Sequence, residues 1–292
     1  MADQTGIEHW KPGVGDFLSL TFDYLKGDAK GLLRVLPLPW LLLVVLSGAM
    51  VWFTFGMATG GVPQFGSVGA IIGGTIVFMI AEYLVVSGLA VMTHRRMALG
   101  PQAAGGFRIG AREVFYLLKG IVFSFLLSLP WMLLVAFLAV GFAILPKEAW
   151  VFALVQSLGM LIGFCIMVLL TVRLMLALPA FAMDQHPGVI QPMKESWRRT
   201  RGCFWSLFLG GVVITMAAGM VSIVPMAASV PFMLGDVMAQ SAPSMGSLII
   251  MAIGQSLVGL IGVVMMLAYV TSAYIFLWAH PDRAAAEAAL AP

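Results

Sequence analysis

Six long apolar stretches alternate with short polar segments along the chain. Their approximate limits are 33–58, 67–93, 114–144, 150–183, 203–235 and 246–279. A helix needs about 20 apolar residues to cross the hydrocarbon core of a bilayer, so each stretch is long enough to span it. Several stretches exceed about 25 residues, which indicates tilted, kinked or extended helices. The pattern predicts an all-α, polytopic membrane protein with six transmembrane helices.

The composition excludes a water-soluble globular protein. Of the 292 residues, 61% are hydrophobic and 10% are charged, whereas soluble domains carry about 25% charged residues. We divide the chain into a tail over 1–13, a membrane domain over 14–280 and a second tail over 281–292. No cleavable signal peptide is expected, because the first 30 residues lack a continuous apolar region.

Basic residues gather on alternate loops, and this asymmetry predicts the orientation. All but two of the 16 Lys and Arg residues precede or begin the first span, follow the sixth, or lie in or just beyond the loops after the second and fourth. The exceptions are Lys147, on the opposite side, and Arg173, inside the fourth span. Because basic loops remain on the cytoplasmic side, both termini are expected in the cytoplasm. The predicted location is a bacterial inner membrane.

Two segments that precede spans have the spacing of amphipathic helices. Residues 14–25 and 189–204 carry apolar side chains every three or four positions, opposite a polar face. This spacing predicts cytoplasmic helices that lie in the headgroup boundary, with Trp197 facing lipid. A simple extension of the following span is the alternative.

Basic side chains at this surface are expected to bind anionic lipid, and each contributes about 1 kcal/mol near the headgroups. The expected contacts are Lys26, Lys119, Lys194, Trp197, Arg198, Arg199 and Arg201.

A short pattern recurs three times. Phe22-x3-Lys26-Gly27 aligns with Phe115-x3-Lys119-Gly120 and with Trp197-x3-Arg201-Gly202. The recurrence favours three repeated two-span units, each introduced by an interfacial helix.

Two neighbouring motifs carry a resemblance to a known family. The run Arg173-Leu-Met-Leu-Ala-Leu-Pro179-Ala is followed by Glu195-Ser-Trp197-Arg-Arg-Thr-Arg201-Gly202. The chain resembles the glycerophosphoryl diester phosphodiesterase membrane-domain family and related uncharacterised six-span bacterial proteins. The family name comes from members with an additional soluble phosphodiesterase domain. About a dozen residues follow the sixth span here, so we expect no such domain and no phosphodiesterase activity.

Two ionisable residues, Glu82 and Arg173, fall well inside predicted spans, away from the span ends that carry Arg34 and Lys119. An uncompensated charge at this depth costs at least about 2.5–3.5 kcal/mol, so each should find a partner or water. Their distances from the cytoplasmic ends correspond to roughly 18 and 15 Å of helix, which would place them level. We predict that they share one polar site. A structural ion pair and a solute, proton or headgroup site are both open.

The sequence contains no motif of a known catalytic or metal site. A phosphate-binding loop, a Gly-x-Ser-x-Gly elbow and a His-Glu-x-x-His helix are all missing, so no catalytic residues, metal or cofactor are expected. Three of the four histidines (His94, His186 and His280) lie at the cytoplasmic ends of predicted spans. Their spacing is not that of metal ligands. Cys165 and Cys203 are expected to be small buried hydrophobic residues.

The leading functional hypothesis is a non-catalytic inner-membrane protein that organises, assembles or stabilises membrane partners and binds lipid. Its expected partners are anionic lipids and a membrane protein or a second copy, and nucleic acid is not needed to explain the basic loops. The alternative is a transporter or lipid-translocating protein that uses the Glu82 and Arg173 site. An intramembrane enzyme is the third hypothesis.

Overall fold

The computed structural model describes residues 12–59, 68–144, 149–184, 188–238 and 245–278, which form helices and no strand. The helices are α2 (Val14–Gly27), α3 (Ala29–Val35), α4 (Pro37–Thr59), α5 (Val68–Leu99), α6 (Pro101–Ala104), α7 (Ala111–Ile144), α8 (Ala149–Leu174), α9 (Ala177–Ala182), α10 (Ile190–Arg199), α11 (Phe204–Met238) and α12 (Met245–Trp278). The all-α prediction is confirmed.

Five helices in the described part of the chain are long and apolar enough to cross a membrane. Their spanning parts are Ile72–Leu99, Ala111–Ala136, Leu154–Leu174, Phe204–Val221 and Ala252–Trp278. A sixth span exists if α3 and the first part of α4 count together, since Ala29–Val35 and Pro37–Met50 meet at an angle of 45°. The bend falls at Pro37, whose ring removes one helical amide donor. The described residues thus contain five or six candidate spans.

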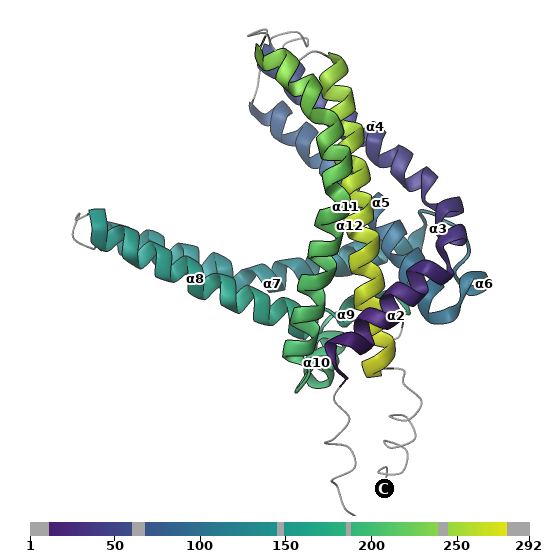
Figure 1. Ribbon diagram of the computed structural model, residues 1–292. Coiled ribbons are helices and arrows are strands. Elements are labelled where there is room, and N and C mark those ends of the chain that lie inside the picture. The colour runs from purple at the N-terminus through teal and green to yellow at the C-terminus, as the bar shows by residue number, and fades with distance from the viewer. Residues whose placement is uncertain (1–11, 60–67, 145–148, 185–187, 239–244, 279–292) are drawn as a thin grey trace, which may run out of the picture.

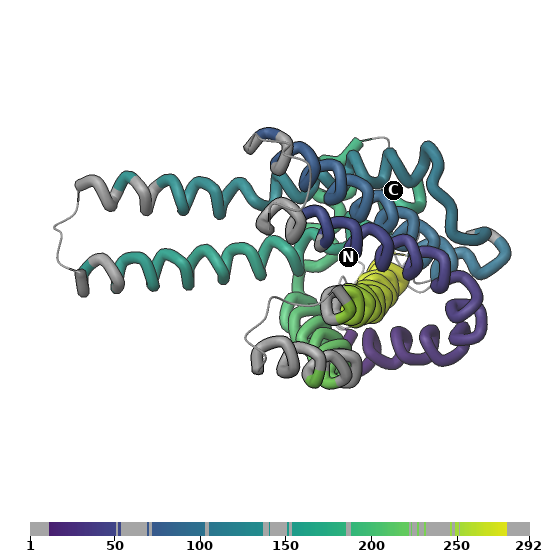
Figure 2. The backbone as a smooth tube through the Cα atoms, turned by 90° about the horizontal axis from the view of Figure 1, so that it is seen from above, coloured from purple at the N-terminus to yellow at the C-terminus, as the bar shows by residue number. Residues whose placement is uncertain are grey.

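The helices form two arms that diverge from one end (Figure 1). We call α4, α5, α11 and α12 the four-helix arm, and α7 with α8 the hairpin arm. Seen from above, the hairpin arm leaves the rest of the molecule as two helices side by side (Figure 2). In the apolar spanning part of α7, 6% is buried inside the protein, compared with 56% in that of α12. The hairpin arm therefore exposes most of its apolar surface.

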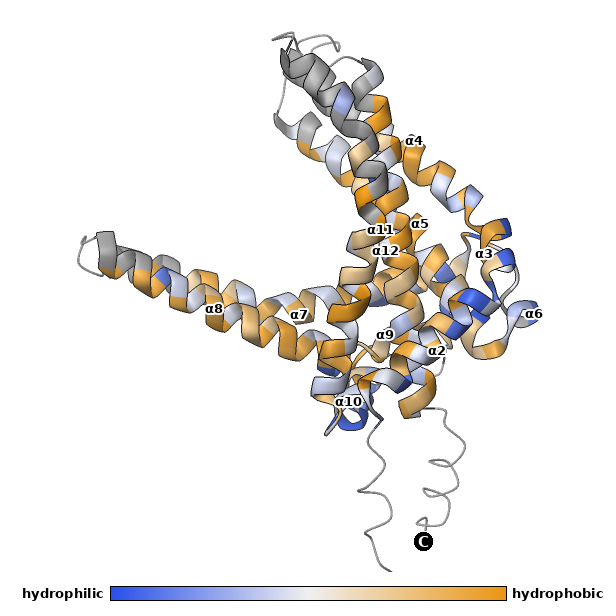
Figure 3. Ribbon diagram, in the orientation of Figure 1, coloured by the Kyte–Doolittle hydropathy of each residue, from blue (hydrophilic) through white to orange (hydrophobic). Residues whose placement is uncertain are grey.

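The arms meet where α2, α9 and α10 gather around the final turns of α5, α8 and α12 (Figure 1). Hydrophilic residues concentrate on α2, α3, α6 and α10 at this end, whereas the arms are mainly hydrophobic (Figure 3). We call this end of the molecule, with α2, α3, α6, α9 and α10, the basic end. It includes the start of α2 and the end of α12, because Phe17 packs edge-on against Phe276.

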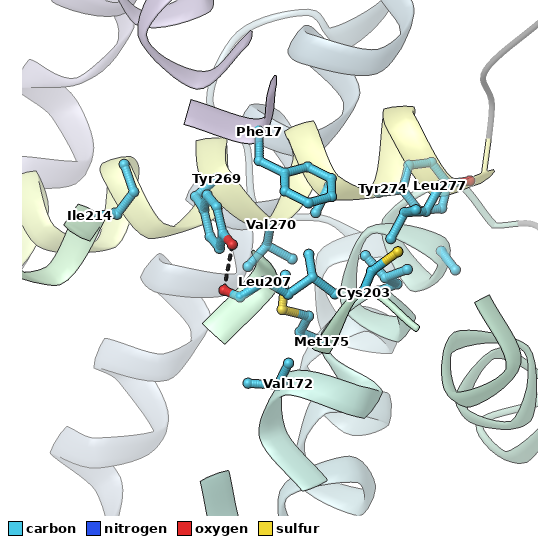
Figure 4. Packing of buried hydrophobic residues seen from close by; sticks show 13 residues of the cluster. Phe17, Val172, Met175, Cys203, Leu207, Ile214, Tyr269, Val270, Tyr274 and Leu277 are labelled. Carbon is cyan, nitrogen blue, oxygen red and sulfur yellow. Dashed lines mark hydrogen bonds between the residues drawn. The ribbon is translucent and has the colours of Figure 1, made fainter. Parts of the chain in front are cut away.

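The core of the basic end forms around Tyr269 on α12 (Figure 4). The Tyr269 hydroxyl donates a 2.5 Å hydrogen bond to the carbonyl of Leu207 on α11. The ring lies so close to α11 that a Cβ atom on Gly210 would be 2.5 Å from the hydroxyl oxygen. Glycine at this position allows the two helices to approach each other.

Residues 14–25 do form a helix, α2, but one face of it packs on protein. Phe17 is fully buried, and the Thr21 hydroxyl donates to Ser272 of α12 at 2.9 Å. Phe22 is 43% exposed. The apolar side chains predicted to face headgroups are thus divided between the protein core and the surface.

The three copies of the recurring pattern have different secondary structures. Gly27 ends α2, Gly120 lies inside the continuous helix α7, and Gly202 follows α10 with a left-handed φ of 87°. The three-unit repeat therefore stays a prediction.

Candidate functional site

The helix that was predicted over 150–183 is divided near its end. α8 stops at Leu174 and α9 begins at Ala177. Pro179 explains the division, because it has no amide hydrogen to donate to the Met175 carbonyl. The amide of Leu178 donates to that carbonyl instead, at 3.3 Å.

Two hydroxyl side chains, one on α10 and one directly after it, replace the backbone hydrogen bonds that are missing at this break. The amide of Leu176 donates to Ser196 Oγ at 3.2 Å, and Ser196 Oγ lies 2.8 Å from the Arg173 carbonyl. Thr200 Oγ1 lies 3.2 Å from the same carbonyl. Ser196 and Thr200 are both fully buried. The two motifs of the family resemblance therefore contact each other here, and the second supplies hydrogen-bond partners to the backbone of the first.

Arg173 extends from the last turn of α8 towards α10. Its guanidinium carbon lies 5.4 Å from the centroid of the Trp197 ring, within the range of a cation–π contact. Its Nε and Nη1 atoms are buried without a hydrogen-bond acceptor in the described part of the protein. Trp197 is 44% exposed, so Arg173 and Trp197 together form part of the surface of the basic end.

Other charged side chains of α10 fix the helix to α12. Arg198 and Arg199 both donate to Glu195 Oε1 at 2.6 Å. Arg199 also donates to the Leu277 carbonyl at 3.1 Å and stacks on the Trp278 ring. Burial raises the pKa of Glu195, but the hydrogen bonds from the two arginines outweigh it and the net pKa is lowered.

The residues predicted to contact lipid differ in exposure. Lys26, Lys194, Trp197, Arg198 and Arg201 are exposed, whereas Lys119 and Arg199 are half-buried. Lys119 lies 5.9 Å from the Phe181 ring centroid. Arg199 is occupied by Glu195 and the end of α12, which gives it a structural role within the protein.

Glu82 lies in a cavity of about 400 Å³ between α4, α5 and α12. Its Oε1 accepts a 3.1 Å hydrogen bond from Ser47 on α4. The other polar residues that line the cavity are Tyr83, Gln255 and Ser256, and the remaining lining residues are apolar side chains and one glycine. The cavity is thus a polar site between spanning helices.

The structure does not join Glu82 and Arg173 in an ion pair. Glu82 bonds to Ser47 in the four-helix arm, and Arg173 stacks on Trp197 at the basic end. No salt bridge in the described residues includes either side chain. We therefore treat them as two separate sites. Sequence reasoning missed Ser47 and Gln255, although uncharged polar residues inside apolar stretches are a signal for such positions.

His94 belongs to a buried hydrogen-bond chain. Its Nδ1 lies 2.6 Å from Thr271 Oγ1, which also lies 2.6 Å from the Leu267 carbonyl. Because the hydroxyl hydrogen goes to that carbonyl, we assign the imidazole proton to Nδ1, and Nε2 then accepts from Tyr116 at 3.5 Å. This chain joins α5, α7 and α12. His186 and His280 lie outside the described residues.

Long apolar helices that join at a hydrophilic end define a multi-pass helical membrane protein. Residues 148–285 match the family described as the membrane domain of glycerophosphoryl diester phosphodiesterase. This part of the chain is similar to that membrane domain, and the resemblance seen in the α8–α10 motifs is confirmed. No curated protein and no solved structure gives a match. The matched part contains Arg173, Ser196 and Thr200, and Glu82 lies outside it.

Proposed function

We propose that this is a non-catalytic membrane protein of a bacterial inner membrane that organises or stabilises membrane partners and binds anionic lipid. In this proposal the basic end faces the cytoplasm, and both termini are on that side. The partner is a second membrane protein or another copy of the chain. The hairpin arm is the observation that carries the proposal.

The hairpin arm is held together internally and exposes apolar side chains outwards. Gly163 of α8 sits against α7, where an added Cβ would lie 2.4 Å from Leu134 and 2.6 Å from Trp131. Leu133 on α7 and Leu161 on α8 are 69% and 58% exposed. Helices with close internal packing and a wide apolar exterior can pack against helices of another membrane protein.

Photo-crosslinking in intact membranes tests this proposal. A photoreactive amino acid at Leu133 or Leu161 should yield a discrete protein adduct, because a partner helix would cover the hairpin arm. Met216 on α11, which is 62% exposed, provides the control position outside the hairpin arm. Two differently tagged copies distinguish self-association from a different partner. Lipid adducts alone at both hairpin positions would overturn the proposal.

Exposed basic residues of the basic end support lipid binding. Lys194, Arg198 and Arg201 lie on or directly after α10, and Trp197 is an aromatic residue of the kind enriched at membrane interfaces. Replacing Lys194 and Arg201 by Gln should reduce the anionic lipid that co-purifies with the protein. Equal lipid content in the variant and the wild type would contradict this part of the proposal.

The Glu82 cavity supports transport as a second candidate function. Ionisable residues inside spans often mark solute or proton pathways. Reconstituted protein with Glu82→Gln should then lose solute or proton movement while remaining folded. If the protein organises partners and transports nothing, the wild type should show no such movement, and Glu82→Gln should still form the crosslinks of the hairpin arm.

A further inference from the structure

We propose that the Glu82 cavity binds an amphiphilic amine, with the ammonium group beside Glu82 and the apolar part along the walls of the cavity. Binding can occur with or without transport, so this inference goes beyond both candidate functions. It rests on the volume of the cavity, the charge of its lining and its position between spanning helices.

The cavity has the dimensions of a ligand site. Its volume of about 400 Å³ falls within the roughly 300–1,000 Å³ of small-molecule pockets. Two consecutive helices and the distant α12 line it: α4 contributes Ser47, α5 contributes Glu82 and α12 contributes Gln255. Because α4 and α5 both contact α12 in the four-helix arm, the site is part of the packed protein.

The charge of the lining selects a cation. Glu82 is the ionisable carboxyl among the lining residues, and none of them is basic. Glu82 accepts a hydrogen bond from the Ser47 hydroxyl, and this donor is uncharged. No salt bridge of the described residues includes Glu82. An ammonium group would supply the missing opposite charge and donate a charge-assisted hydrogen bond.

The apolar walls and the location select an amphiphile. Leu43, Met79, Val86, Leu260 and Val263 surround the polar residues. Tyr83 is 57% exposed beside them, so the cavity is close to the outer surface of the arm. A small hydrophilic cation would leave these walls without contacts, whereas an alkyl chain would cover them. An amine with an apolar chain satisfies both parts of the site.

Equilibrium binding to the full-length protein in nanodiscs of zwitterionic lipid tests the proposal. The probes are N,N-dimethyldodecylamine, which is cationic at pH 7, and dodecanol, which has the same chain length without charge. Wild-type protein should bind the amine saturably above empty nanodiscs and at least about tenfold more tightly than dodecanol, a ratio that corresponds to about 1.4 kcal/mol. Equal binding of the amine and dodecanol would overturn the proposal.

Variants assign the binding to this cavity. Glu82→Gln should reduce amine affinity at least about tenfold, and Leu43→Trp should block binding by filling the cavity while the carboxyl remains. Asp23→Asn, on the exposed surface of α2, removes a carboxylate elsewhere and should bind as the wild type does. Unchanged amine binding by Glu82→Gln or by Leu43→Trp would exclude the cavity as the site.

A protection measurement on the wild-type chain does not depend on whether a variant folds. A lipophilic carbodiimide should modify Glu82, which mass spectrometry of the peptide would show. The tertiary amine cannot form an amide with the activated carboxyl, so it acts only as a competitor. Saturating amine should slow modification of Glu82 at least about tenfold, and dodecanol should not. Modification at the same rate with and without the amine would contradict the proposal.

Discussion

At the residue scale, the hydroxyl groups of Ser196 on α10 and of Thr200 directly after it are expected to stabilise the break after α8. Thr200→Val removes a buried donor that lies 3.2 Å from the Arg173 carbonyl, and Ser196→Ala leaves the Leu176 amide without an acceptor. Ser196→Ala should lower the free energy of unfolding by about 1–3 kcal/mol, because a buried amide loses its acceptor. Thr200→Val should lower it by less, because the Arg173 carbonyl keeps its 2.8 Å contact with Ser196 Oγ.

Thr215→Val is the matched control for this prediction. Its hydroxyl is exposed and bonds to the Gly211 carbonyl within its own helix, so we expect little change. Denaturant titration in detergent micelles provides the measurement. Equal unfolding curves for the Thr200 and Thr215 variants would contradict the role assigned to the break.

Gly210 should be intolerant of a side chain. In Gly210→Ala the new Cβ would lie 2.5 Å from the Tyr269 hydroxyl and 2.9 Å from a ring carbon, so α11 and α12 must separate or the ring must move. We expect a loss of about 1–3 kcal/mol in stability. Tyr269→Phe in the same chain should recover part of it by removing the nearest atom. Gly219→Ala, with no atom within 4 Å of its added Cβ, is the control in a thermal unfolding assay.

The sequence contained part of the information about these residues. Pro179, Ser196 and Thr200 all stood in the two motifs that carry the resemblance. The four-residue spacing of Ser196 and Thr200 places both hydroxyls on the same face of a helix. That this face would meet the Arg173 carbonyl depends on how α10 folds back on α8, and no local pattern encodes that contact.

At the element scale, the attachment of α10 should depend on pH through Glu195. Its carboxyl has a lowered pKa in the folded protein, relative to the ordinary value of 4.5. A lowered folded-state pKa stabilises the protein fully above the unfolded pKa, and this stabilisation decreases as pH falls through the folded pKa. Thermal unfolding between pH 6 and pH 3 should therefore show a decrease below about pH 4.5. The decrease should be smaller in Glu195→Gln, and an identical pH profile would contradict the role of this carboxyl.

The positions of the helices follow the apolar pattern closely, but their rotation does not. The stretch predicted at 114–144 corresponds to α7 over Ala111–Ile144, and the stretch at 246–279 to α12 over Met245–Trp278. Length and hydropathy determine where a spanning helix lies along the chain. A helix that is apolar all round has no polar stripe to orient it. The depths of Glu82 and Arg173 could thus be compared from the sequence, but the helix face from which each projects could not.

At the scale of the whole molecule, the proposed orientation predicts a labelling pattern. Cysteines at Ser67 and Ser241, which lie outside the described residues, should react with an impermeant thiol reagent from the periplasmic side. A cysteine at Ala103 in α6, at the basic end, should not react from that side, because basic loops remain in the cytoplasm. A chain with Cys165 and Cys203 replaced by Ala provides the background. External labelling at Ala103 alone would reverse the orientation.

The divergence of the arms is compatible with the length of their helices. The apolar spanning parts of α7 and α12 contain 26 and 27 residues, or roughly 40 Å of helix at about 1.5 Å per residue. A hydrocarbon core of about 30 Å matches such lengths when the helix axis is tilted by roughly 40° from the membrane normal. Two arms tilted in opposite directions can therefore both cross one bilayer and fill it from surface to surface.

This geometry gives the molecule a wedge-shaped outline in a section perpendicular to the plane of the membrane (Figure 1). The arms occupy a small area in the leaflet at the basic end and a larger, lipid-filled area in the other leaflet. A wedge fits best where the leaflet at its wide end is stretched, so we expect the protein to concentrate in strongly curved bilayers whose convex face is on that side. The amount of protein per membrane area in vesicles of about 30 and 200 nm diameter would measure this preference. Equal amounts per area in both would contradict a dependence on curvature.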